Sequence, residues 1–245
     1  DLQMLRNLPQ SNTQGAIIWA VHTPPFAEVL FELKSQHYPF VLVDAMPDYL
    51  NISAMVCDNY KAGYEVGQVL IERGHRNIGF IGDLLASTSA NRLAGLRDAM
   101  ADAGILFHRS LLSDIDQHRS GNHEWIEAIR KATRALLQQY TPNRTPTAMV
   151  CSCDGVAAYA YPVFREAGFN IPRDLSMVGF DGASFTEAMD PPLTTMQQPM
   201  YQMGQEAVSA LIDMINDNMH PPVRKMFDAT FIERSSIAPA PALAH

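Results

Sequence analysis

The hydrophobic residues of this chain follow two patterns that alternate along its length. Short continuous apolar runs are typical of strands buried on both faces, and they cover residues 15–20, 39–43, 54–57, 77–82, 147–152 and 175–180. A last strand is expected at 226–233. A further extended segment is expected at 193–198, after a double proline. Strands that alternate with helices predict an α/β fold, with parallel sheets covered by helices on both faces.

The helices are predicted where apolar residues recur at helical spacing, which occurs at 2–8, 26–33, 62–70, 93–100, 126–140, 154–167 and 203–215. Pro162 lies inside one of these helices and is expected to kink it, because proline removes a backbone hydrogen bond. About ten strands would form a very large single sheet, so we expect two Rossmann-like, doubly wound lobes. The Pro- and Ala-rich tail at 238–245 is expected to be flexible.

Composition narrows the class of protein. Of 245 residues, 47% are hydrophobic and 18% are charged, which predicts a globular protein with room for two lobes rather than a disordered chain. The net charge of −8 makes the chain a poor binder of nucleic acid, because phosphate contacts need clustered Lys and Arg. No apolar run reaches the ~18 residues of a membrane helix, so no membrane partner is expected.

The sequence contains no recognisable catalytic or metal-binding motif. Nothing marks Ser87 or Ser89 as a nucleophile, and His118 and His123 are expected to be solvated loop residues. The cysteines also lack the spacing of redox or zinc sites, so we expect core thiols in a reducing compartment at Cys57, Cys151 and Cys153. We therefore expect neither an enzyme nor a protein with a cofactor or metal.

Several polar residues follow the predicted strands, where open α/β sheets place their ligand contacts. Arg92 opens a helix and is either an exposed helical arginine or a fork that clamps a ligand. Asp44, Asp154 and Asp181 each end a strand and are either turn or helix-cap residues or ligand contacts; the cap role is favoured for Asp154. Trp125 is either packing filler or a stacking platform. Together they indicate a small-molecule site.

From about residue 15 to 236 the chain resembles the effector-binding core of the LacI/GalR family of bacterial transcription regulators. The matching segments are PFVLVD (39–44), VCDNYKAGYEVGQVLIERGHRNIGFIG (56–82), NRLAGLRDAMADAGI (91–105), PTAMVCSCDGVAAYA (146–160), GFNIPRDLSMVGFDG (168–182), PPLTTMQQPMYQMGQEAVSALI (191–212) and FIERSSIAP (231–239). Each segment is modest alone, but their order and spacing are highly specific.

The resemblance implies the type I fold of periplasmic binding proteins, in which three crossovers join two lobes. By this alignment the N-terminal lobe comprises 1–57 plus 199–225, and the C-terminal lobe comprises 58–198 plus 226–237. The family's helix-turn-helix and first β-α-β unit have no counterpart in this chain, so we expect an N-terminal lobe that is incomplete at its front. Operator DNA would then be bound only through a domain missing here.

The resemblance also implies effector contacts at matching positions. Arg92 matches the arginine of an R-x-x-G motif that clamps the effector, and Asp181 matches an acidic contact. Asp44 and Gln198 match positions that contact ligand in some members. Trp125 or His123 lies near where an aromatic residue often stacks on the ligand.

Other matching positions depart from the family pattern or have a structural role. Cys153, an expected effector contact, replaces the asparagine of the family's usual Asn-Asp pair, and Gly182 replaces a second acidic residue. Asp154 matches the aspartate that follows this asparagine, and it is expected, like Asp58, to be a helix-cap or structural residue near the site.

The resemblance thus implies a cytoplasmic, dimeric sensor that binds a small molecule between its lobes and controls operator binding. An arginine, an aspartate and an aromatic residue suit a sugar or sugar derivative, and a purine is the second choice. The alternative is a periplasmic sugar-binding protein of a transporter, which shares the fold. The RGHRNIGFIG and PPLTT segments and the unpaired cysteines favour the regulator.

Overall fold

The protein consists of two compact units in the computed structural model, which describes residues 2–19, 23–47, 49–116, 124–141, 144–217 and 221–241. Unit 1 comprises Asp1–Asp58, Ala86–Thr88 and Pro199–Asp228, and unit 2 comprises Asn59–Leu85, Ser89–Gln198 and Ala229–His245. The expectation of two separate α/β lobes is confirmed, because the strands form two sheets.

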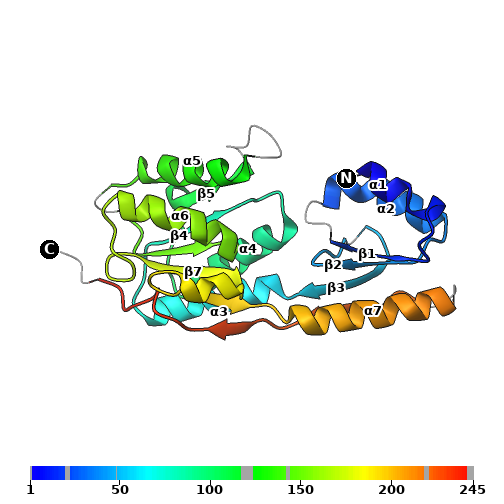
Figure 1. Ribbon diagram of the computed structural model, residues 1–245. Coiled ribbons are helices and arrows are strands. Elements are labelled where there is room, and N and C mark those ends of the chain that lie inside the picture. The colour runs from blue at the N-terminus through cyan, green and yellow to red at the C-terminus, as the bar shows by residue number, and fades with distance from the viewer. Residues whose placement is uncertain are drawn as a thin grey trace. The chain divides into compact units, whose positions relative to one another are not determined.

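Unit 1 is built on a parallel sheet with the strand order β1-β2-β3-β9. Its strands are β1 (Ala16–Trp19), β2 (Phe40–Val43), β3 (Ser53–Cys57) and β9 (Arg224–Phe227). Its helices are α1 (Leu2–Arg6), α2 (Thr23–Ser35) and α7 (Met200–Asn216), with a 3-10 turn η1 (Leu8–Gln10). Helices α1 and α2 lie on one face of the sheet and α7 on the other (Figure 1).

The core of unit 1 forms around β2 and β3, whose residues are buried almost throughout. Leu30 and Leu33 of α2 pack on Leu42 of β2, and Met203 and Ala207 of α7 are fully buried. This burial removes apolar surface from water on both sides of the sheet, which stabilises the layered arrangement.

Unit 2 is built on a mostly parallel sheet with the order β10-β8-β7-β6-β4-β5, in which only the β10–β8 pair is antiparallel within the described residues. Its strands are β4 (Ile78–Gly82), β5 (Leu112–Asp114), β6 (Ala148–Cys151), β7 (Ser176–Asp181), β8 (Thr194–Gln197) and β10 (Thr230–Ile232). Its helical elements are α3 (Asn59–Glu72), α4 (Ser87–Asp102), α5 (Trp125–Leu137), α6 (Asp154–Glu166), η2 (Arg109–Leu111) and η4 (Ser184–Ala188).

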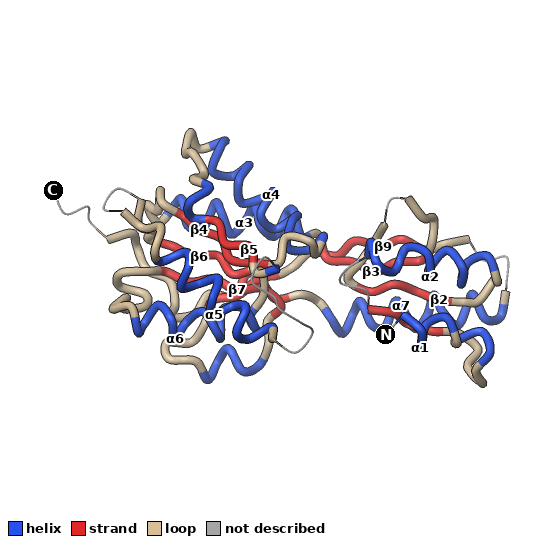
Figure 2. The backbone as a smooth tube through the Cα atoms, turned by 90° about the horizontal axis from the view of Figure 1, so that it is seen from above, coloured by secondary structure: helices blue, strands red, loops and turns tan. Residues whose placement is uncertain are grey.

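Two apolar clusters hold the layers of unit 2 together. One joins α5 and α6 to one face of the sheet, and the other joins α3 and α4 to the opposite face; Figure 2 shows the two helix pairs on either side of the strands. Helices α3 and α4 come so close that a side chain on Gly63 would overlap the carbonyl of Arg92, and one on Gly95 would overlap that of Tyr60. Glycine is therefore needed at both positions.

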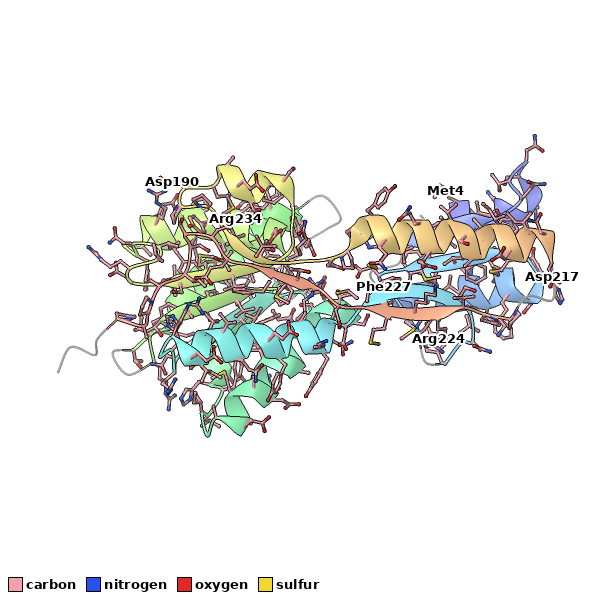
Figure 3. All side chains as sticks on the ribbon, turned by 90° about the horizontal axis from the view of Figure 1, so that it is seen from below. Met4, Asp190, Asp217, Arg224, Phe227 and Arg234 are labelled. Carbon is pink, nitrogen blue, oxygen red and sulfur yellow. The ribbon has the colours of Figure 1, made fainter. Side chains whose placement is uncertain are left out.

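The expected single strand over 226–233 is wrong. The chain passes from unit 1 to unit 2 at Asp228, so the segment is divided into β9, which pairs with β3, and β10, which pairs with β8. Figure 3 labels Arg224 and Phe227 at the two ends of β9 and Arg234 after β10. The apolar residues on either side of Asp228 could not reveal that the two halves of this segment have different hydrogen-bond partners.

The expected flexible tail is also wrong for its first residues. Ala238 donates its N–H to Ser176 Oγ at 3.0 Å and accepts a hydrogen bond from the buried ring of His75 at 3.0 Å. Ala240 donates to the carbonyl of Arg73 at 2.8 Å. Backbone groups thus anchor this segment although its side chains are small. Residues 242–245 lie outside the described part of the chain.

Candidate functional site

The strands β7, β6 and β4 are neighbours in the sheet of unit 2, and all three run in the same direction. Their carboxyl ends therefore lie along one edge of the sheet, where α/β proteins place ligand contacts. Ser152 follows β6, Asp181 ends β7, and α4 begins a few residues after β4. The edge brings together side chains from segments far apart in the sequence.

Arg92 on α4 is buried and is held by several partners at this edge. Its Nε donates to Oδ1 of Asn59 at 2.7 Å, and its Nη1 donates to the carbonyl oxygen of Ser152. Nη1 also lies 3.6 Å from Oδ1 of Asp181, and the guanidinium stacks over the Phe180 ring at 4.6 Å. The exposed-arginine alternative is therefore excluded. A guanidinium carries five N–H donors in a planar fork, which suits a ligand with several acceptors.

Asp181 is held in an unusual backbone conformation. Its φ of 109° lies in a region that side chains other than glycine rarely adopt, and such strain often accompanies function. Gln198 stabilises it by donating Nε2 to Oδ1 of Asp181 at 2.8 Å and its backbone N–H to the carbonyl of Asp181 at 3.3 Å. The Asp181 side chain remains 40% exposed, so its carboxylate can still accept hydrogen bonds from a ligand.

The residue that caps α6 is Cys153, not Asp154 as the sequence suggested. The thiol Sγ of Cys153 accepts a hydrogen bond from the N–H of Val156 at 3.4 Å, so Asp154 is the first residue within the helix. The Asp154 carboxylate instead accepts from Thr195 Oγ1 at 2.7 Å and from the N–H of Ala183 at 2.8 Å. The Asp154 carboxylate thus connects the start of α6 to β8 through Thr195. It also connects the helix to the loop after Asp181, where it accepts the N–H of Ala183.

Burial changes the protonation of both residues. Burial raises the pKa of Asp154 to about 6, although hydrogen bonds from Thr195 and the loop oppose the shift. Burial and the nearby Asp181 raise the pKa of Cys153 to about 11, so its thiol is protonated at neutral pH. Arg92 and Asp181 compensate each other, and the cluster has little net positive charge to attract an anion.

Four buried side-chain polar atoms of unit 2 have no hydrogen-bond partner among the described residues, and two of them, Oε1 of Gln198 and Oγ of Ser89, lie near this edge of the sheet. Ser89 lies on α4 directly against Gly82, the last residue of β4. Buried polar atoms are normally satisfied, so atoms like these indicate where a ligand hydroxyl or a water would be bound.

Trp125 lies at the start of α5, and its ring reaches Gly155 next to Cys153 at the start of α6. Its ring packs edge-on against Tyr159, with a centroid distance of 6.0 Å, and a side chain on Gly155 would meet it at 2.9 Å. The packing role explains this geometry, and contact with an effector stays a prediction. His118 and His123 lie outside the described residues.

Asp44 belongs to unit 1, at the carboxyl edge of that unit's own sheet. It follows β2, has a φ of 63°, and accepts a hydrogen bond from Nε1 of Trp19 at 3.3 Å. Asp58 precedes α3 and donates its backbone N–H to the carbonyl of Phe227 at 2.8 Å; its role as a helix cap stays a prediction.

Sequence reasoning missed the residues that position the arginine and the loop. Asn59, Thr195 and Phe180 have no distinctive motif, and their role depends on contacts between segments more than 30 residues apart. It also missed Trp19, which we expected inside a buried strand and which is 67% exposed. A tryptophan at the end of a strand was the one available signal.

The side chains at this edge are hydrogen-bond donors and acceptors. They offer guanidinium donors, carboxylate and amide acceptors and a hydroxyl, which suit a ligand with several hydroxyl groups. Among the described residues, no group of three His, Cys, Asp or Glu side chains is placed to hold a metal, and no helix is long and apolar enough to cross a membrane.

The fold and the site thus define a class of protein: a binding protein of two α/β units with ligand groups at the carboxyl ends of its strands. Residues 68–237 match the family model of the periplasmic binding protein-like domain. The HTH-type transcriptional repressor PurR of Escherichia coli O1:K1 is 32% identical over 240 residues, which are 97% of this chain and 67% of PurR.

Two solved structures are also similar. The transcriptional regulator CelR in complex with cellobiose has a TM-score of 0.81 and 26% identity, over 96% of this chain and 69% of that one. A LacI family regulator from Enterococcus faecium with bound ribose has a TM-score of 0.80 and 25% identity, over 97% of this chain and 84% of that one. The chain belongs to the LacI/GalR family of transcriptional regulators, of which it forms the effector-binding core. These relatives are regulators, not enzymes, and they favour regulation over the transport alternative.

Proposed function

We propose that this protein is a sensor that binds a neutral, polyhydroxylated effector, a sugar or sugar derivative, and thereby controls the binding of operator DNA by the regulator. The observation that carries this proposal is the cluster of the buried Arg92, Asn59 and Gln198 with the partly exposed Asp181, which has paired donors and acceptors and no excess charge. A sugar hydroxyl both donates and accepts hydrogen bonds, so it suits such a cluster.

Two relatives support a sugar, because their structures contain cellobiose and ribose. The name of PurR supports a purine as the second choice. A purine would find the same guanidinium and carboxylate, but the unpartnered Ser89 hydroxyl and Gln198 carbonyl suit additional hydroxyl groups better.

The mechanism would be a population shift. An effector that binds one arrangement of the two units more tightly than another changes the populations of both by its difference in affinity. The regulator would act in the cytoplasm. It would act there as a homodimer, because paired DNA-reading heads recognise two half-sites at a fixed spacing. The chain itself, with a net charge of −8, is not expected to hold DNA.

Isothermal calorimetry with cellobiose, ribose and guanine tests the proposal. Asp181→Asn removes the carboxylate charge, and we expect it to weaken the binding of the active ligand by ~1.5–3 kcal/mol, which is about 10- to 150-fold. The matched control is Asp213→Asn on the exposed side of α7, which should leave affinity unchanged. If none of the three compounds binds, or if both variants bind as the wild type does, the proposal is wrong.

A further inference from the structure

Unit 1 has an exposed tryptophan at the carboxyl edge of its sheet. Trp19 is the last residue of β1 and lies opposite Val43 in the register with β2, so Asp44 comes one residue beyond it on the neighbouring strand. The Trp19 side chain is 67% exposed. Tryptophan is on average one of the more buried residue types, so a side chain this open needs an explanation.

The indole is not a loose surface group. Its Nε1 donates to Oδ2 of Asp44 at 3.3 Å, and Asp44 has a backbone conformation, φ 63°, that is uncommon for residues other than glycine. The Asp44 N–H donates to the carbonyl of Met55 at 2.9 Å, which anchors this conformation to β3. The structure thus keeps an aromatic face and a carboxylate together in a strained turn, and strain of this kind clusters at ligand sites.

We propose that Trp19 and Asp44 form a sugar-stacking platform on unit 1, a specificity-determining element that rests on the proposed function. The indole face would receive the apolar face of a sugar ring, and the carboxylate would accept hydrogen bonds from hydroxyl groups at its rim. This pairing suits a ring with one face free of polar substituents and disfavours an anion, which the Asp44 charge would repel.

The competing explanation is that Trp19 is an apolar surface that another protein segment covers. Ile17, two residues earlier on the same side of β1, is also exposed. Ile17 cannot form the hydrogen bond to a carboxylate that Trp19 forms, and a simple packing surface would not need one. The two explanations predict different results for ligand binding and for stability.

The chain provides an optical test, because Trp19 and Trp125 are its two tryptophans. In a Trp125→Phe protein, Trp19 is the sole tryptophan reporter, and its emission and its quenching by acrylamide are followed during titration with cellobiose, ribose and guanine. We expect the sugar that binds by calorimetry to shift the emission and to reduce the quenching several-fold, since a stacked ring shields the indole.

Affinity provides the second measurement. Trp19→Ala should weaken the binding of that sugar by ~10-fold or more, and Trp19→Phe, which keeps an aromatic face, by only about 3-fold. Phe31→Ala is the control, because Phe31 is an equally exposed aromatic residue of unit 1, 62% accessible, in the middle of α2.

The outcomes separate this inference from the proposed function. Sugar binding with unchanged Trp19 emission and unchanged affinity in Trp19→Ala would overturn the platform and leave the proposed function intact. Loss of stability in Trp19→Ala, together with unprotected Trp19 in the single-tryptophan protein, would establish the covering role instead. Protection by guanine alone would overturn the assignment to a sugar, and absence of binding by all three compounds would overturn both proposals.

Discussion

The two units hold their ligand-facing residues in contrasting ways. In unit 2, Arg92 is buried and bonded to Asn59, Ser152 and Asp181 before any ligand arrives. In unit 1, one hydrogen bond of 3.3 Å holds the exposed indole of Trp19 to Asp44. A preorganised cluster loses little entropy on binding, whereas an exposed side chain must be ordered by its ligand. The Arg92 cluster of unit 2 is thus the more preorganised of the two proposed ligand-binding elements, and Trp19 of unit 1 is the less ordered one.

The largest expected effect tests whether the cluster of unit 2 is integral to the fold. Arg92→Met should lower the free energy of unfolding by about 3 kcal/mol, because it leaves the acceptors of Asn59 and Ser152 buried without a donor. Asp44→Asn in unit 1 should change it by less than ~1 kcal/mol, because asparagine still accepts from Trp19 and tolerates a positive φ. Urea denaturation measures the free energy of unfolding of both variants. Equal losses in Arg92→Met and Asp44→Asn would contradict the difference between the two units.

A smaller effect on stability is expected from replacing one helical glycine in each unit by alanine. Gly63→Ala should destabilise the protein by about 2–3 kcal/mol, because the new Cβ would overlap the carbonyl of Arg92 and push α4 outward. Gly204→Ala on α7 of unit 1 meets no atom within 4 Å and should stabilise it by ~0.5–1 kcal/mol through helix propensity. Thermal unfolding shows whether each variant is more or less stable than the wild type. Unchanged stability of Gly63→Ala would show that α3 and α4 can separate without cost.

The smallest effect concerns pH. Because the pKa of Asp154 is raised to about 6 in the folded state, the folded protein holds this proton more tightly than the unfolded chain does. Its contribution to stability therefore falls as pH rises from about 4 to about 6 and stays reduced above that. Asp154→Asn should remove this decline, so between pH 4 and 7 the variant should gain ~1–2 kcal/mol relative to wild type.

The measurement compares urea denaturation of the two proteins across this pH range. Burial lowers the pKa of His75, so its contribution to the free energy of unfolding is lost as pH falls, which is opposite to the effect of Asp154. The His75 contribution is the same in both proteins and cancels when their free energies of unfolding are subtracted. If the free energies of unfolding of the two proteins changed in parallel with pH, burial would not raise the pKa of Asp154.

Local patterns were enough to predict most strands and helices. The apolar runs that became β4, β6 and β7 are short and uninterrupted, and burial on both faces of a parallel sheet requires this pattern. Asp181 was also accessible from sequence, because a polar residue at the end of a buried strand is conspicuous, and Arg92 was accessible through its match to the R-x-x-G motif. Their chemistry follows from where a parallel sheet places its carboxyl ends.

By itself, then, the sequence determined the layered α/β class and the family, because both depend on residue types at fixed spacings. Only the tertiary structure decided that Asn59 holds Arg92, that Cys153 rather than Asp154 caps α6, and that Trp19 is open to solvent. It also decided that the run at 226–233 is divided between two sheets. The physical reason is the same in each case: these outcomes depend on competition among partners distant in the chain, and hydrophobic periodicity contains no information about which partner is nearest.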